Sequence, residues 1–290
     1  MQDAAITANT KIPNPDIKLL VVDIDGTIVG DDNSVRKIVK QAINRARAKG
    51  IRTAIATGRM YCSALQFYKE VISDLPIIAY QGAWIQEPIT NVNHCHLVVP
   101  RLITEKLLEY FEQPKLRDIL SVHFYINDKL YVRELSQDTK AYAQRSGVKP
   151  IPVGDLRKTL DNEPTKILAL CQDHNIINQL MQNIRYQYNP NQLYLTKSLP
   201  TFLEAAHPQV NKGTAVKYLA EEILGLLSRN VMTIGDNFND LEMIEYAGIG
   251  VAMSDAPAPV KAAAQWVAPS FKEDGVAVAI NRFLLGNSRG

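Results

Sequence analysis

The apolar residues at the start of this chain come in short blocks separated by segments with a helical period. Residues 19–22, which follow Lys18, are all apolar, as in strands buried on both faces of a sheet. Residues 35–46 repeat apolar positions with the 3.6-residue period of an amphipathic helix, and Ser34 can cap that helix. Further strands are predicted over residues 51–56 and 76–80. This strand–helix–strand order predicts a parallel sheet flanked by helices.

The pattern changes between about residues 84 and 206. Alternating apolar and polar residues at 121–126 and 129–134 flank Asn127 and Asp128, which predicts a β-hairpin. The same stretch contains helical patterns at residues 102–111, 139–146 and 175–188 and an apolar strand at 166–170. A separate, largely antiparallel α+β module is therefore predicted here.

Alternating order resumes in the last third of the chain. The predicted elements are a helix at 213–227, a strand at 230–234, a helix at 241–246 and a strand at 249–253. The predicted fold class is α/β, with a Rossmann-like parallel sheet core flanked by helices. Residues 1–83 and 207–290 form this discontinuous core, and residues 84–206 are inserted into it as the α+β domain. Such an insertion is tolerated when its two ends lie close together.

Two aspartates follow the first predicted strand. Asp23 and Asp25 end the apolar run and precede Gly26 and Thr27. Ligands bind at the carboxyl ends of parallel strands, so both carboxylates are expected in that crevice. Their mutual repulsion would be relieved by a hard divalent cation with oxygen ligands, such as Mg²⁺. Asp and Gly are also ordinary turn residues, so a polar turn that caps the next helix is the alternative.

A second acidic cluster follows the strand predicted at residues 230–234. It reads Gly235-Asp236-Asn237-Phe238-Asn239-Asp240. If both strands belong to one parallel sheet, Asp23 and Asp236 can supply carboxylates to the same Mg²⁺. A helix capped by Asp236 or Asn239 is the structural alternative.

Thr57 and Lys212 complement the carboxylates because they lie where helices are predicted to begin. Backbone N–H groups at a helix start bind anions, Thr57 adds a hydroxyl donor, and Lys212 adds a compact cation. Together with the aspartates they indicate a site for a phosphoryl group. A threonine cap and a solvated lysine are the alternative interpretations.

Composition excludes several other classes of function. Charged residues make up 21% of the chain and the formal net charge is +2, which does not favour binding to nucleic acid. We expect no membrane span, because no apolar segment approaches the roughly 20 residues required, and residues 1–17 lack the apolar centre of a signal peptide. Cys62, Cys95 and Cys171 are odd in number and widely spaced, as expected for a cytoplasmic protein.

These motifs, taken in order, resemble the haloacid dehalogenase superfamily and, within it, the Cof-like sugar-phosphatase branch. The four matching segments are residues 23–27, 57–59, 211–213 and 235–240. The resemblance extends over nearly all of the chain after about Asp16. The chain departs from it at Gln81, where these proteins usually carry Asn. The insert at residues 84–206 resembles the α/β cap domain of that branch.

The resemblance implies a Mg²⁺-dependent phosphatase that hydrolyses small phosphomonoesters, sugar phosphates or related metabolites, through an aspartyl-phosphate. The catalytic residues that it implies are Asp23 as nucleophile, Asp25 as acid and base, and Lys212. The implied substrate-binding residues are Thr57, Gly58, Arg59, Gln81 and Asn239. The implied metal-site residues are Asp23, Asp25, Asp236 and Asp240, with Asp25 acting through its backbone carbonyl.

Two other functions use the same motifs. A phosphomutase forms the same aspartyl-phosphate but returns the phosphoryl group to a second sugar hydroxyl. A noncatalytic sensor of a phosphorylated ligand would retain the fold without turnover. A P-loop NTPase is disfavoured, because the chain contains no GxxxxGK[ST] motif. The identity of the substrate and the oligomeric state cannot be read from the sequence.

Overall fold

The computed structural model describes residues 16–30, 32–197 and 199–286. One sheet consists of five strands in the order β14-β13-β12-β1-β2, and every neighbouring pair is parallel. Its strands are β1 (Leu19–Val22), β2 (Arg52–Ile55), β12 (Val231–Gly235), β13 (Ile249–Met253) and β14 (Trp266–Ala268). The prediction of a parallel core sheet is therefore confirmed. The strand order places β1 beside β12, which brings together the two loops that carry aspartates.

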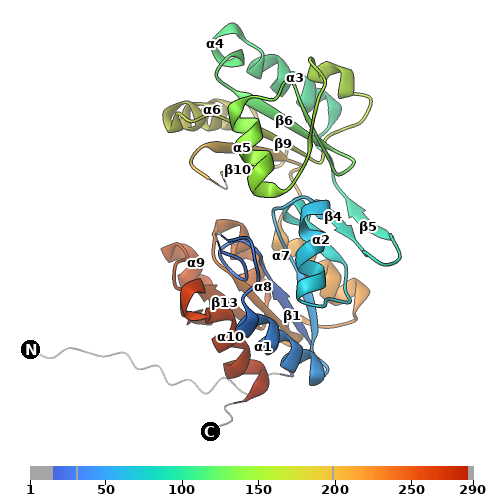
Figure 1. The fold of residues 1–290 in the computed structure, drawn as a ribbon, viewed down its shortest axis with the longest axis vertical. Helices are drawn as coiled ribbons and strands as arrows, with labels where there is room; N and C mark the ends of the chain where they lie inside the picture. The colour runs from blue at the N-terminus through green and yellow to red at the C-terminus, as the bar shows by residue number, and fades with distance from the viewer. Residues whose placement is uncertain (1–15, 31, 198, 287–290) are drawn as a thin grey trace, which may run out of the picture.

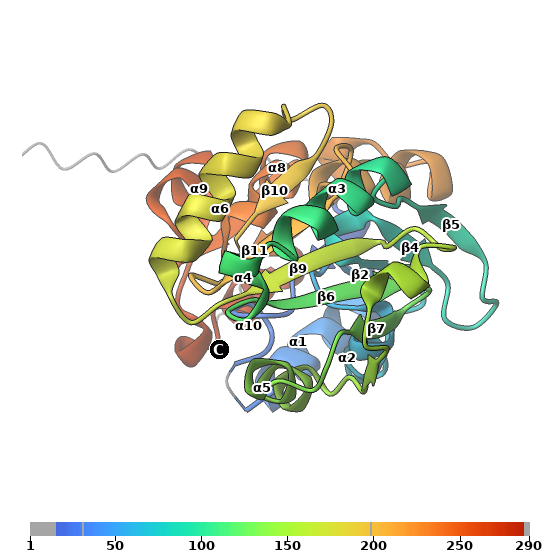
Figure 2. The same ribbon diagram turned by 90° about the horizontal axis from the view of Figure 1, so that it is seen from above.

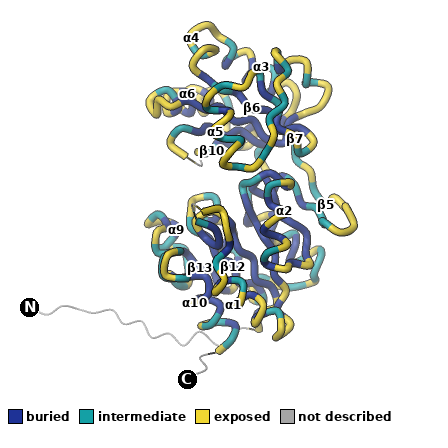
Figure 3. Tube along the Cα trace, in the orientation of Figure 1, coloured by how far each residue is buried: buried dark blue, intermediate teal, exposed yellow. Residues whose placement is uncertain are grey.

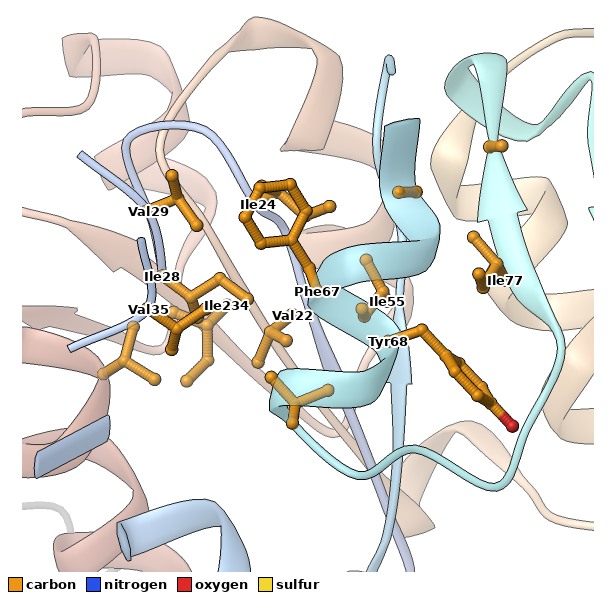
Figure 4. Packing of buried hydrophobic residues seen from close by; sticks show 14 of the residues in the cluster. Val22, Ile24, Ile28, Val29, Val35, Ile55, Phe67, Tyr68, Ile77 and Ile234 are labelled. Atoms are coloured by element: carbon orange, nitrogen blue, oxygen red, sulfur yellow. The ribbon is translucent and has the colours of Figure 1, made fainter. Parts of the chain in front are cut away.

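Both faces of this sheet are buried, because alternate residues of each strand point to opposite faces. Leu20 and Val22 belong to the apolar cluster that contains α1 and α10, whereas Leu19 and Val21 belong to the cluster that contains α7. Figure 4 shows Val22, Ile24 and Ile234 within the first of these clusters. The helices around the sheet are α1 (Lys37–Ala48), α2 (Tyr61–Glu70), α7 (Lys212–Tyr218), α8 (Leu241–Tyr246), α9 (Ala258–Ala263) and α10 (Gly275–Ile280).

The six-stranded sheet lies in the upper lobe of Figure 1, above the parallel sheet. Its order is β10-β11-β9-β6-β7-β8, and its pairs are antiparallel except β7 with β8. The strands are β6 (Ser121–Ile126), β7 (Lys129–Val132), β8 (Pro150–Pro152), β9 (Lys166–Leu170), β10 (Tyr194–Thr196) and β11 (Phe202–Ala206). The helices of this lobe are α3 (Arg101–Phe111), α4 (Pro114–Arg117), α5 (Gln137–Ser146) and α6 (His174–Gln187). The hairpin around Asn127 and Asp128 is confirmed.

The strand predicted at residues 76–80 joins the parallel sheet only through one bridge between Ala56 and Ile78. It instead forms β3 (Ile77–Ala79), which pairs antiparallel with β4 (Trp84–Gln86), and β5 (Asn93–His96) completes a three-stranded sheet. Tyr80 and Gln81 adopt positive φ angles of 50° and 61°. This left-handed turn reverses the chain. Strand β4 therefore pairs with β3 rather than with the six-stranded sheet.

Several predicted helix ends differ from the structure. The helix expected to open at Thr57 begins instead at Tyr61, with Met60 as its N-cap. Ser34 does not cap α1, because its hydroxyl donates to Asp32 at 2.7 Å and the helix begins two residues later than predicted. The helix predicted at residues 213–227 is shorter: α7 ends at Tyr218 and one π-helical turn, Leu219–Ile223, extends it. Gly225 follows with a φ of 64°, which favours glycine and ends the helical path.

The remaining helical segments are short. Single 3₁₀ turns span Tyr80–Gly82, Leu156–Thr159, Ser228–Asn230, Phe238–Asp240 and Phe271–Glu273, and a π-helical turn, Asn281–Leu285, follows α10. Within residues 16–30, 32–197 and 199–286, none of the helices combines the length and apolar character needed to cross a membrane. Figure 3 shows that burial is concentrated in the sheets, whereas the outer helix faces and many loops are exposed.

Candidate active site

The loop after β1 places Asp23 and Asp25 in different environments. Asp23 is only 4% exposed, whereas the side chain of Asp25 is 59% exposed. Gly26 between Asp25 and Thr27 has a φ of 80°, and a Cβ there would collide with the carboxylate of Asp236. The glycine therefore allows the first loop to approach the loop after β12. Thr27 joins the two loops directly by donating its hydroxyl hydrogen to Asp236 Oδ1 at 3.1 Å.

Asp240 stabilises the loop after β12 by accepting hydrogen bonds from backbone N–H groups of that loop. Its Oδ2 accepts hydrogen bonds from the backbone N–H groups of Asp236 at 2.9 Å and Asn237 at 3.0 Å. Its Oδ1 accepts a hydrogen bond from Lys212 Nζ at 2.6 Å. Both oxygens of Asp240 are thus bound by protein donors, which suits a residue that holds the loop in position.

Lys212 lies between two carboxylates at the start of α7. Its Nζ lies 2.5 Å from Asp23 Oδ1 and 2.6 Å from Asp240 Oδ1, and its side chain is fully buried. The preceding residue, Asn211, caps α7 by accepting a hydrogen bond from the N–H of Thr214 at 2.6 Å. The cap and the tight packing of α7 orient the lysine towards Asp23.

The charges in this cluster are unbalanced. Carboxylate oxygens of Asp23, Asp236 and Asp240 lie within 4.8 Å of one another. Burial raises the pKa of Asp23 well above its usual value, Lys212 opposes the rise, and Asp240 adds to it. Burial, and then Asp240, likewise raise the pKa of Asp236 to about 7. Burial alone would disfavour the charge of Lys212, but Asp23 and Asp240 raise its pKa above the ordinary value.

This donor set fits a divalent cation. Three carboxylates face one lysine, so two negative charges are left without a partner in the cluster when all three are ionised. Oxygen ligands are those that hard cations such as Mg²⁺ prefer, and a cation would offset the burial and the repulsion that raise the pKa values of Asp23 and Asp236. Three of the four predicted metal-site residues share this cluster, and Asp25 lies on the same loop as Asp23.

The turn after β2 contains Thr57, Gly58 and Arg59. Thr57 is fully buried, and its Oγ1 accepts a hydrogen bond from the N–H of Arg59 at 3.1 Å. Arg59 binds Asp25 with two hydrogen bonds, from Nε at 2.8 Å and from Nη2 at 2.6 Å. Its guanidinium also lies 4.7 Å from the centre of the Phe67 ring. Arg59 therefore contacts the predicted acid and base, a contact that sequence analysis did not foresee.

Gln81 connects the turn after β2 with the loop after β12. Its Oε1 accepts a hydrogen bond from Asn239 Nδ2 at 2.9 Å. A Cβ at Gly58 would collide with the amide of Gln81, so Gly58 allows this close contact. The structure thus brings together three of the predicted substrate-binding residues, although Gln81 is one methylene longer than the usual Asn.

Lys166 and Glu204 were missed as candidates. Both are about 95% buried on the six-stranded sheet, and Lys166 Nζ lies 3.5 Å from Glu204 Oε2 and 3.5 Å from the carbonyl oxygen of Gly58. Their signal in the sequence was a charged residue in each of two strands that are otherwise apolar. A charge at such a position is rarely buried without a partner. The pair brings the upper lobe into contact with the turn after β2.

Comparisons with known proteins agree with this arrangement. Residues 20–280 match the family model of haloacid dehalogenase-like hydrolases. The chain is 32% identical to the protein YxeH of Bacillus subtilis (strain 168) over 287 residues, which cover 92% of this chain and 98% of YxeH. It is 30% identical to the 5-amino-6-(5-phospho-D-ribitylamino)uracil phosphatase YcsE of the same organism, with coverage of 93% and 97%.

A solved structure is also similar over almost the whole chain. The crystal structure of a haloacid dehalogenase-like hydrolase from Bacteroides thetaiotaomicron superimposes with a TM-score of 0.82 at 26% identity. The match covers 92% of this chain and 99% of that protein. Both lobes are therefore included in the similarity.

Proposed function

The chain belongs to the haloacid dehalogenase-like hydrolases, in their Cof-like branch, and we propose that it is a Mg²⁺-dependent phosphatase of small phosphorylated metabolites. The family relationship makes it a phosphoric monoester hydrolase. The proposed reaction proceeds through an aspartyl-phosphate. The observation that carries the proposal is the buried cluster in which Lys212 contacts Asp23 and Asp240 beside Asp236. A cluster of this composition has a nucleophile, a fixed cation and ligands for a metal.

Asp23 is the proposed nucleophile. It lies at the end of β1, and Lys212 holds its Oδ1. Its carboxylate would attack phosphorus, form an acyl phosphate and release the alcohol, so that one difficult displacement becomes two easier steps. Water would then hydrolyse the acyl phosphate and return Asp23 to its original state. Lys212 would offset negative charge throughout both steps.

Asp25 is the proposed acid and base. Its side chain is 59% exposed, and Arg59 orients its carboxyl group through two hydrogen bonds. It would donate a proton to the departing alkoxide and later accept one from the hydrolytic water. Arg59 would thus have a positioning role in addition to the substrate contact predicted from sequence.

The proposed metal ligands are the side chains of Asp23 and Asp236 and the backbone carbonyl of Asp25. Bound Mg²⁺ would supply electrostatic stabilisation of the phosphoryl oxygens. Asp240 would hold Lys212 and the loop after β12 in position rather than bind the metal directly, because both of its oxygens already bind protein donors. Thr57 and Asn239 would donate to phosphoryl oxygens, and Gln81 would hold Asn239 in place.

The proposed substrates are sugar phosphates and related metabolites. The name of one relative specifies a phosphorylated ribitylamino-uracil, in which the leaving group is a polyol attached to a pyrimidine. We propose that residues 84–206 form a cap that lies over the leaving group, with Lys166 and Glu204 on its inner face. The three cysteines are free thiols, which supports a reducing location such as the cytoplasm.

The test is release of inorganic phosphate from a panel of small phosphomonoesters, with Mg²⁺ and with a chelator. We expect Mg²⁺-dependent release that Asp23→Asn lowers by about a thousandfold or more, because the anionic nucleophile is lost while its shape is kept. Asp173→Asn is the matched control: Asp173 caps α6, and an asparagine there retains the cap. An isomerised hexose phosphate without phosphate release would instead identify a mutase, and ligand binding without either product would identify a sensor.

A further inference from the structure

Helix α2 (Tyr61–Glu70) follows the Thr57–Gly58–Arg59 turn but has no capping side chain from its own segment. Its N-cap residue is Met60, whose side chain makes no capping hydrogen bond and has only a weakly accepting thioether sulfur. The first N–H groups of a helix lack partners within the helix and need an acceptor from elsewhere. Helix α2 lies on the side of the lower lobe that faces the upper lobe (Figure 1).

The acceptor comes from the other lobe. Asp128, in the turn between β6 and β7, accepts a hydrogen bond from the backbone N–H of Cys62 through Oδ2 at 2.8 Å. Asn127 and Asp128 have φ angles of 49° and 56°, so the turn has the left-handed conformation in which Asn and Asp are favoured. Asp128 therefore acts as an N-cap for a helix that lies 66 residues earlier in the chain.

The same carboxylate binds a second element beside the site. Tyr80 donates its hydroxyl hydrogen to Asp128 Oδ1 at 2.8 Å. The backbone N–H of Tyr80 donates to the carbonyl oxygen of Arg59 at 2.9 Å, and that of Gln81 donates to Thr57 at 2.9 Å. Asp128 thus contacts the helix that follows the Thr57–Arg59 turn and also the segment that is hydrogen-bonded along that turn.

We propose that Asp128 is a positioning residue for the reaction: by capping α2 and binding Tyr80, it sets the geometry of the Thr57–Gly58–Arg59 turn and couples that geometry to docking of the upper lobe. This inference rests on the proposed phosphatase function. The carboxylate does not touch the predicted reacting atoms, so its effect passes through α2 and through Tyr80 and Gln81. Docking of the lobe and order in the turn would then be one event.

The hydrogen bonds of Asp128 to Cys62 and Tyr80 require the two lobes to lie close together. An acidic group at a helix N-terminus is favoured both by the free N–H groups and by the helix dipole. Burial raises the pKa of Asp128, while hydrogen bonds from Tyr80 and the Cys62 backbone oppose that rise. Separation of the lobes would leave Cys62 and Tyr80 without this partner. Ser63 adds a second link by donating to the carbonyl oxygen of Ser146 at 2.8 Å.

The experiment compares Asp128→Ala, Asp128→Asn and Asp173→Ala in the full chain. Asp173 is the matched control, because it caps α6 within the upper lobe by accepting from the N–H of Asn175 at 2.8 Å. Among the residues that the structure describes, its side chain has no hydrogen bond to the lower lobe. Two quantities are measured: the hydrogen-exchange rate of the Cys62 amide, and kcat and KM for phosphate release. Thermal unfolding of each variant establishes that it is folded.

We expect Asp128→Ala to speed exchange of the Cys62 amide by about tenfold and to lower kcat/KM by about tenfold, the size of effect that loss of one helix cap would produce. Asp128→Asn should remain within about twofold of the unmodified protein in both quantities, because asparagine also caps helices. Asp173→Ala should speed exchange at Asn175 and leave kcat/KM within about twofold.

Three results would overturn the inference while the phosphatase function stands: unchanged Cys62 exchange in Asp128→Ala, unchanged kcat/KM in that variant, or an equal loss in Asp173→Ala. Absence of phosphate release from the unmodified protein would overturn the proposed function and the positioning role together. The exchange measurement keeps the two failures distinct, because it reports the contact without any turnover.

Discussion

Asp236 illustrates at the residue scale what it costs to bury a carboxylate beside a second one. Its pKa is raised to about 7 by burial and by Asp240, so its ionised form opposes folding when no cation is bound. We therefore expect Asp236→Asn at pH 8 in chelator to be more stable than the unmodified protein, on the order of 2 kcal/mol. Loss of charge at the hydrogen bond to Thr27 reduces this gain.

Thermal and urea unfolding, with chelator and with Mg²⁺, would measure the effect. The unmodified protein should gain stability on addition of Mg²⁺, and Asp236→Asn should lose most of that gain. Asp32→Asn is a control that removes one exposed carboxylate, which binds Ser34 and is not part of the Asp23, Asp236 and Asp240 cluster, and it should leave the Mg²⁺ response intact. A variant at position 236 that is less stable than the unmodified protein in chelator would contradict the prediction.

His123 makes a second residue-scale prediction, in the upper lobe. It is fully buried, bonds to Thr139 Oγ1 at 2.9 Å, and burial, with a smaller effect of Lys166, lowers its pKa to about 3. The unfolded chain binds this proton near pH 6.5, whereas the folded chain does not. Stability is therefore complete above about pH 6.5 and falls as the pH decreases towards 3, by about 2 kcal/mol at pH 5 from this group alone.

The comparison with His123→Gln isolates that contribution. Glutamine can bond to Thr139 but does not titrate, so the free energy of unfolding of the variant should depend less on pH between 7 and 5. The difference between the two slopes is the informative quantity, because burial also lowers the pKa values of His96 and His207 in both proteins. Parallel pH profiles would show that His123 is protonated in the folded state.

At the element scale, the position of Lys212 depends on how closely α7 approaches α8. A Cβ at Gly213 would lie 2.6 Å from the carbonyl carbon and oxygen of Glu242, which are backbone atoms that cannot rotate away. We expect Gly213→Ala to lower stability by about 1–3 kcal/mol through overpacking, and to lower kcat because α7 carries Lys212 away from Asp23. Urea unfolding and steady-state kinetics would check both.

Thr214→Ala is the control for this element. Thr214 is exposed and its N–H, which binds Asn211, is unaffected by the change. Its stability and kcat should stay close to those of the unmodified protein. Equal stability in Gly213→Ala would mean that α7 and α8 can separate without cost.

At the scale of the whole molecule, the two larger sheets meet around one turn. Lys166 of the upper lobe contacts the Thr57–Arg59 turn at the carbonyl oxygen of Gly58. Asp128 of the same lobe binds the N-terminus of helix α2 at the N–H of Cys62. Figure 2, viewed from above, shows the upper lobe lying over the lower lobe. The formal net charge of the chain is only +2, so the electrostatics of the site arise from local crowding rather than from overall charge.

Much of the fold was predictable because local sequence determines it. The bounds of β9 and α8 agree with the apolar periods, and the hairpin at Asn127 and Asp128 was evident from its turn residues. The motifs proposed to carry the chemistry were equally evident, because each follows a strand or precedes a helix. The individual roles of Asp23, Asp25 and Lys212, and the domain boundary at residue 84, stay predictions.

Tertiary structure decided which residues share a contact. Periodicity could not show that Arg59 binds Asp25, that Asp240 uses both oxygens within the protein, or that Asp128 caps α2 from 66 residues away. It also missed the reversal at Tyr80, because a left-handed backbone at a non-glycine residue has little local signal. The sequence by itself determined the elements and the chemistry of their ends, since these depend on neighbours in the chain; the pairing of those ends depends on how distant segments pack.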